Sequence, residues 1–380
     1  MFFFFTIFFT IYATVNFYIF IRGWQALNTI PALKPFYLVI FLIAASSYLL
    51  AKIFSTSLPK VVYDGMLWIG SFWFAYILYL FLAIVLIDVI RLVNWKFDIY
   101  PLFVKQNFEL TKRIIFFSVF GLSTVIIFFG FLNTRNLKII TLEIEIPKGN
   151  SELTELNIVT VSDIHLSPMN SERLLSDIVD KINSLNPDVV LMPGDIVDDK
   201  AVILKERNIG GALKSLKAKY GVFASNGNHE FISGIEGAAP YLREHNIHLL
   251  EDSVYKLENS FYVIGRDDRS KSIFTGKPRK SLKEIISAAD KDLPMILLDH
   301  TPLNLEEAEQ NNIALQLSGH THHGQMFPAS LITNMIYEVS WGYKKKSSTH
   351  FYVSCGVGTW GPPVRIGSDS EIVQIKVTLK

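Results

Sequence analysis

Five polar segments, each directly after an apolar run, contain residue types that bind metals and transfer protons. They are Ser162-Asp163-Ile164-His165, Gly194-Asp195-Ile196-Val197-Asp198, Gly227-Asn228-His229-Glu230, Asp299-His300 and Gly319-His320-Thr321-His322-His323. Six of the nine histidines lie in these segments, and none precedes His165. Imidazole, carboxylate and amide oxygen together suit Mn²⁺, Fe or Zn²⁺ better than Ca²⁺ or Mg²⁺. The segments therefore predict a transition-metal site.

The apolar runs that must position these side chains are typical of short strands. The expected strands are Ile158–Val161, Val189–Met192, Val222–Ser225, Met295–Leu298, Ala314–Leu317, Phe351–Ser354 and Ile372–Val377. Helical stretches at Ser171–Leu185 and Ala201–Lys219 separate the early ones. This alternation predicts an α/β domain, and the shorter spacing of the later strands favours a mixed sheet or two stacked sheets. Open α/β sheets bind ligands at the carboxyl ends of their strands, where the five segments lie.

In kind and order, the segments resemble the blocks of the calcineurin-like metallophosphoesterases: D-x-H, G-D-x-x-D, G-N-H-[DE], H and G-H-x-H. The resemblance covers residues 155–380 and implies a four-layer α/β/β/α sandwich with a metal site at the strand ends. The Gly319–Gln325 segment and the tail Val353–Ile366 are similar to the membrane-associated bacterial branch, in which the position of His323 is commonly glycine. That branch includes phosphodiesterases and relatives that act on UDP-diacylglucosamine.

Carried over position by position, the resemblance implies two divalent metal ions, with Mn, Fe or Zn as candidates. One ion would take Asp163, His165 and His322, the second would take Asn228, His300 and His320, and Asp195 would bridge both. A metal-bound hydroxide would attack a phosphodiester or a pyrophosphate-linked, including lipid-linked, substrate in line, and His229 would protonate the leaving oxygen. The residues expected to orient ligands or to lie close to substrate are Asp198, Glu230, His323 and Arg365.

The first 134 residues have a different composition. They contain the apolar runs Phe2–Ile21, Pro35–Ala51, Gly65–Ile87 and Ile114–Thr134. A membrane-spanning helix needs about 20 mainly apolar residues, so we expect four such helices at about 2–21, 35–52, 65–88 and 114–134. A mean hydropathy of +0.30 and 19% charged residues exclude one ordinary soluble protein. Residues 135–154 are expected to be a linker and residues 155–380 the phosphoesterase domain.

The basic residues of the loops predict an orientation. Seven lie in the loops after the first and third apolar runs, against five on the other side. The positive-inside rule therefore predicts that the catalytic domain lies outside the cytoplasm. The resemblance to the bacterial branch implies that the membrane is a bacterial plasma membrane. Asp88 lies beside Arg91 at the end of a run and is expected at the membrane interface. Charged residues are absent within the runs, which favours an anchor over a transporter.

Two other functions remain open from the sequence: a phosphomonoesterase, and a catalytically silent metal-binding membrane sensor or scaffold. The segment Gly356–Gly361 matches the dinucleotide fingerprint G-x-G-x-x-G, but Pro362-Pro363 follows where a helix should begin, so we reject a dinucleotide site. No nucleic-acid-binding signature is present in the sequence. The single cysteine, Cys355, excludes an internal disulfide.

Overall fold

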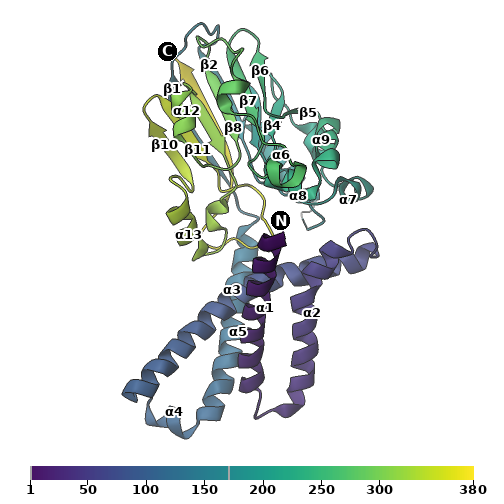
Figure 1. Ribbon diagram of the computed structural model, residues 1–380, viewed down its shortest axis with the longest axis vertical. Coiled ribbons are helices and arrows are strands. Elements are labelled where there is room, and N and C mark those ends of the chain that lie inside the picture. The colour runs from purple at the N-terminus through teal and green to yellow at the C-terminus, as the bar shows by residue number, and fades with distance from the viewer. Residues whose placement is uncertain (1, 170–171) are drawn as a thin grey trace. The chain divides into compact units, whose positions relative to one another are not determined.

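A computed structural model describes residues 2–169 and 172–380 of the chain (Figure 1). Ser171, the first residue of one expected helix, lies outside the described residues. The chain forms two compact units. Unit 1 consists of Met1–Leu132 and Gly361–Val364, and unit 2 of Asn133–Trp360 and Arg365–Lys380.

Unit 1 is helical. Its long helices are α1 (Phe2–Ala26), α2 (Lys34–Ile53), α3 (Lys60–Phe97) and α5 (Phe108–Asn133), and its short ones are η1 (Pro31–Leu33) and α4 (Leu102–Gln106). Among the described residues, these four long helices are long and apolar enough to cross a membrane, as expected. The 38-residue α3 extends well beyond its apolar run because a change to polar side chains does not itself end a helix. It ends where Asp98 adopts a left-handed conformation with φ of 50°.

Unit 2 contains two six-stranded sheets. The first has the order β1-β12-β2-β3-β4-β5, formed by β1 (Leu137–Ile146), β12 (Ser370–Leu379), β2 (Glu155–Thr160), β3 (Val189–Pro193), β4 (Val222–Ser225) and β5 (Ile247–Leu250). Strands β2 to β5 run parallel, and β12 is antiparallel to β2. The second has the order β10-β11-β9-β8-β7-β6, formed by β10 (Gly342–Lys346), β11 (Thr349–Val353), β9 (Leu315–Ser318), β8 (Met295–Asp299), β7 (Phe261–Arg266) and β6 (Ser253–Leu257). Its four central strands are parallel, and β10 and β6 are antiparallel edges.

The cores of unit 2 show how the layers stack. Successive strand residues point to opposite faces of a sheet, so Val190 of β3 packs toward the helices while Val189 and Leu191 pack between the sheets. A third core covers the outer face of the second sheet. The helices of unit 2 are α6 (Glu172–Ser184), α7 (Ala201–Glu206), η2 (Gly211–Ser215), α8 (Asn228–Ser233), α9 (Ile235–Glu244), α10 (Lys271–Thr275), α11 (Leu282–Ile285), α12 (Glu306–Gln310), η3 (His322–Gly324) and α13 (Ala329–Ile336). The expected α/β/β/α sandwich is confirmed.

Two local expectations differ from the structure. Half of the segment expected as a linker is β1, which pairs in parallel with β12 over ten residues. Its alternation of Ile144 and Ile146 with charged residues is the pattern of a half-exposed edge strand. The helix expected at Ala201–Lys219 is broken, because Asn208 and Gly210 adopt φ of 50° and 95° between α7 and η2.

Candidate metal centre

The strands of both sheets bring the five polar segments to one place. Asp163, Asp195 and Asn228 follow β2, β3 and β4 of the first sheet, while His300 and His320 follow β8 and β9 of the second. Contacts cross between the sheets: His300 Nε2 lies 3.0 Å from Asp195 Oδ2, and the backbone N–H of His320 donates to Asp163 Oδ1 at 3.1 Å. The site is therefore built where the carboxyl ends of two stacked sheets meet.

Asp163, His165 and His322 form one group that could hold a metal ion. The Nε2 atoms of His165 and His322 lie 3.0 Å apart, and His322 Nε2 lies 3.3 Å from Asp163 Oδ1. All three side chains are buried. Two imidazole nitrogens and a carboxylate aimed at one point are a donor set that fits a transition metal.

A second group consists of Asp195, His300 and His320, with Asn228 beside it. Asn228 Oδ1 lies 3.2 Å from His300 Nε2 and 2.9 Å from His320 Nδ1. The contact of His300 Nδ1 with the Pro193 carbonyl at 2.8 Å assigns the proton to Nδ1, which leaves the Nε2 lone pair for a ligand. Asp195 Oδ2 also lies 3.9 Å from His165 Nε2, so Asp195 stands between the two groups.

The backbone of the site is strained. Asp163, His165, Asp195, His320 and His322 have φ between 47° and 70°, a region that L-residues with side chains rarely adopt. Such conformations persist only where the surrounding structure enforces them, and they cluster at functional sites.

Two glycines of the motifs permit close approach to the carboxylates, a role that we did not anticipate from the sequence. A Cβ at Gly227 would lie 2.2 Å from Asp195 Oδ1, and one at Gly319 would lie 2.1 Å from Asp163 Oδ2. Both glycines precede a candidate ligand, Asn228 or His320, and that constant spacing is the available sequence signal.

Glu230 supports the loop that contains Asp195. Its carboxylate accepts backbone N–H bonds from Asp195, Ile196, Val197 and Gly227 at 2.7–3.0 Å. Burial and the nearby Asp195 carboxylate raise the pKa of Glu230, whereas these N–H donors favour its charged form. Glu230 therefore fixes the backbone beside Asp195 and belongs to none of the candidate metal groups formed by described residues.

His229 lies beside the candidate ligands. Its Nδ1 forms an ion pair with Asp198, and its backbone N–H donates to Asp195 Oδ1 at 2.8 Å. The ring centroid lies 4.7 Å from that of His165 and 6.3 Å from that of Trp360. With His165 and Asp195 it forms a third group within reach of a metal ion. The sequence analysis missed Trp360, which lies far from the polar segments along the chain.

Arg365 is fully buried and holds a loop. Its Nη2 donates to the carbonyls of Cys355, Gly356 and Gly358 at 2.6–3.0 Å and lies 3.5 Å from His322 Nδ1. The fingerprint-like glycines thus form a loop around an arginine. His323 Nδ1 lies 3.2 Å from Ser340 Oγ, and His323 is in none of the metal groups found among described residues.

The buried carboxylates of the site favour the binding of cations. Burial alone would lower the pKa of His165, but Asp163, Asp198 and Asp195 raise it to about 10. His300 likewise has a raised pKa because Asp195 outweighs its burial, whereas burial lowers the pKa of His320 and His322. Without a metal, the carboxylates therefore draw protons onto two imidazoles. Metal binding would displace such protons, since a ligating imidazole must be neutral.

Comparison with known proteins gives consistent matches. The calcineurin-like phosphoesterase family profile matches residues 156–324. A zebrafish (Danio rerio) transmembrane protein with a metallophosphoesterase domain is 31% identical over 266 residues, covering 67% of this chain and 60% of the zebrafish protein. A Campylobacter jejuni metallophosphoesterase is 31% identical over 70% of this chain and 71% of its own length. One from Aquifex aeolicus is 31% identical over 62% of this chain and 89% of its own length.

Proposed function

The chain belongs to the calcineurin-like metallophosphoesterases, and on that premise we propose that it is a membrane-anchored, two-metal phosphoesterase acting on phosphodiesters or pyrophosphate-linked lipids. The observation that carries this proposal is the position of Asp195 between two groups of metal-binding side chains. A single carboxylate that lies between two such groups is suited to act as a bridging ligand. Two ions held by one bridge can stabilise both the entering and the leaving oxygen of an in-line displacement.

In this proposal Asp163, His165 and His322 hold one ion. The other is held by Asn228, His300 and His320, with Asp195 shared. A bound pair of Mn²⁺, Fe or Zn²⁺ ions would supply a lowered pKa of coordinated water and neutralise phosphoryl charge. The protein's own contribution is to aim the ligands: Pro193 orients His300, and Arg365 lies against the far nitrogen of His322.

His229 is the proposed acid that protonates the leaving oxygen. Asp198 lies against its Nδ1, which orients the ring and leaves Nε2 to face the substrate. Its backbone bond to Asp195 keeps the imidazole beside the candidate metal groups. This pair also favours an active enzyme over a silent sensor, because a metal-filled scaffold would not need an oriented proton donor.

Apolar residues beside the site support a lipid-linked substrate. Helix α13 exposes Leu331, Ile332, Met335 and Ile336, and Met335 is 86% exposed. The Tyr337 ring that follows lies 6.1 Å from His320. An apolar surface adjoining a phosphate-directed site suits an amphiphilic ester.

The proposed orientation places unit 2 outside the cytoplasm of a bacterial cell. It rests on the excess of basic residues in the loops after α1 and α3. A reporter enzyme fused after Lys380 should be active only in its extracytoplasmic form. Activity of a cytoplasm-dependent reporter there would overturn this orientation.

The deciding experiment is hydrolysis by the full-length protein in detergent with Mn²⁺. Bis-p-nitrophenyl phosphate should be cleaved faster than p-nitrophenyl phosphate, and a chelator should abolish both activities. A preference for the monoester would favour the phosphomonoesterase. No turnover of either ester or of a lipid pyrophosphate, with metal shown to be bound, would favour the silent sensor.

A further inference from the structure

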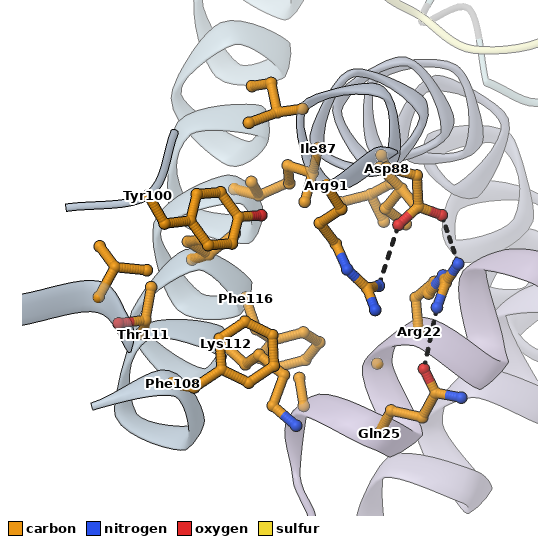
Figure 2. Close-up of a pocket in the computed structure, with 18 residues that line it drawn as sticks. Arg22, Gln25, Ile87, Asp88, Arg91, Tyr100, Phe108, Thr111, Lys112 and Phe116 are labelled. Carbon is orange, nitrogen blue, oxygen red and sulfur yellow. Dashed lines mark hydrogen bonds and ion pairs between the residues drawn. The ribbon is translucent and has the colours of Figure 1, made fainter. Parts of the chain in front are cut away.

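A cavity of about 260 Å³ opens within unit 1, among α1, α3 and α5 (Figure 2). Its walls are largely apolar and include Leu80, Ile84, Ile87, Ile115, Phe116 and Val119. It lies toward the end of the helices where α1 ends and α5 begins, since Ala26 and Phe108 also line it.

The polar residues of the cavity carry excess positive charge. Arg22, Arg91 and Lys112 line it, against a single acidic lining residue, Asp88. Figure 2 shows Asp88 between the two arginines, with ion pairs of 2.5 Å to Arg22 and 3.1 Å to Arg91. Lys112 pairs with Glu109, which does not line the cavity. Even with Glu109 counted, one positive charge remains uncompensated.

We infer that this cavity binds an anionic lipid, with its phosphate headgroup between Arg91 and Lys112 and an acyl chain along the apolar wall. Lysine and arginine at a membrane boundary attract anionic headgroups, and arginine binds phosphate through parallel N–H bonds. The apolar wall offers an acyl chain the contacts that a free phosphate would not use. Of the candidate anions, an amphiphile matches both halves of the cavity.

The inference rests on the proposed insertion of unit 1 in a membrane and is independent of hydrolysis at the metal centre. The cavity lies on the side that the basic residues assign to the cytoplasm, where anionic lipids give the leaflet a negative surface potential. Basic residues near such a surface strengthen the binding of anionic lipids.

The test is native mass spectrometry of the full-length protein in detergent, titrated with phosphatidylglycerol or phosphatidylcholine. We expect phosphatidylglycerol to bind at least about tenfold more tightly. The double variant Arg91→Gln/Lys112→Gln should lose about tenfold or more of that affinity. Ile115→Trp, which keeps every charge and fills the apolar wall, should lose it as well. Lys96→Gln, which removes a charge near the same end of α3 without touching the cavity, should bind like the native chain.

Equal binding of the two lipids, or unchanged binding by both cavity variants, would overturn the inference. Displacement of the lipid by glycerol 3-phosphate at similar concentration would also overturn it, because it would identify a site for small anions. Circular dichroism and thermal unfolding of each variant separate lost affinity from lost folding. Cleavage of bis-p-nitrophenyl phosphate by the same samples reports separately on the proposed phosphoesterase.

Discussion

The two units place the same types of apolar residue in opposite environments, exposed in unit 1 and buried in unit 2. In unit 1, Phe36 and Ile40 of α2 are 67% and 66% exposed, whereas every residue of β3 in unit 2 is buried. A surface as apolar as that of unit 1 suits a lipid environment, and a strand as apolar as β3 suits the middle of a sandwich. Exposure of apolar groups therefore distinguishes the two environments independently of hydropathy.

The two units also differ in the polar residues that they bury. The uncharged residues Asn16, Ser47, Ser71 and Ser123 are buried in the helices of unit 1, while unit 2 buries Asp163, His165, Asp195 and His300 at one edge of its sheets. Burying charge is costly unless it is paired or binds metal. Chemistry is thus concentrated in unit 2, and substitutions there should have effects that equivalent changes in unit 1 do not.

The largest effect is expected at the shared carboxylate. Asp195→Asn removes a charge that faces both metal groups, so hydrolysis of bis-p-nitrophenyl phosphate should fall by about 10³-fold or more. Elemental analysis should show lost metal in parallel. Asp177→Asn on the exposed face of α6 is the matched control and should leave both unchanged. Full metal content and activity in Asp195→Asn would exclude the bridging role.

His229→Ala should lower kcat by about 10²- to 10⁴-fold, the usual contribution of a general acid. Metal content should remain at the native level, which separates this residue from the ligands. Asp198→Asn should cost less, about 10- to 100-fold, because it disturbs only the orientation of His229 and His165. Loss of metal in His229→Ala would instead make His229 a ligand. His248→Ala on the exposed side of β5 is the control.

A pair of glycine substitutions sharpens the comparison between the units. Gly227→Ala would place a methyl group 2.2 Å from Asp195 Oδ1, so it should destabilise unit 2 by about 1–3 kcal/mol and reduce activity. Gly121→Ala in α5 meets nothing within 4 Å and should be neutral or stabilising by up to about 1 kcal/mol. Thermal unfolding of the full-length protein measures both. Equal destabilisation by the two would contradict the distinction.

The smallest expected effect lies outside the site. His350 of β11 contacts the Glu145 carbonyl of β1 at 3.0 Å, and burial lowers its pKa. The unfolded chain then binds more protons than the folded one as pH falls below about 6.5, so this residue destabilises the fold in acid. His350→Gln should show a slightly smaller drop in Tm between pH 7.5 and 5.5. An unchanged or larger drop would show that the lowered pKa does not affect stability.

The sequence predicted the architecture where its signals are local. The strands before Asp163 and His320 each consist of an apolar run that is followed directly by a polar motif. The run and its motif lie within a few residues of each other in the sequence. It failed where the signal depends on distant partners. Edge strand β1 is defined by pairing with β12 at the other end of the chain, and the loop-holding role of Arg365 depends on carbonyls that its own motif does not reveal.

The environment of Asp88 shows the same limit. Its neighbour Arg91 was visible in the sequence, but Arg22 comes from a different helix. That interhelical contact turns an interface residue into part of a charged cavity wall. Packing between helices of similar composition leaves little trace in hydropathy, so no pattern predicted the cavity.

The candidate metal centre is divided between two sheets, so metal binding would tie the lifetime of the protein to the supply of the cation. Asp195 follows a strand of one sheet and His300 a strand of the other, so an ion bound to both would act as a cross-link that exists only in the folded state. By mass action, free metal at 100 times its Kd would add about 2.7 kcal/mol to the free energy of unfolding. A cell short of the metal would then lose this protein to proteolysis as well as its activity, so abundance itself would report on metal status.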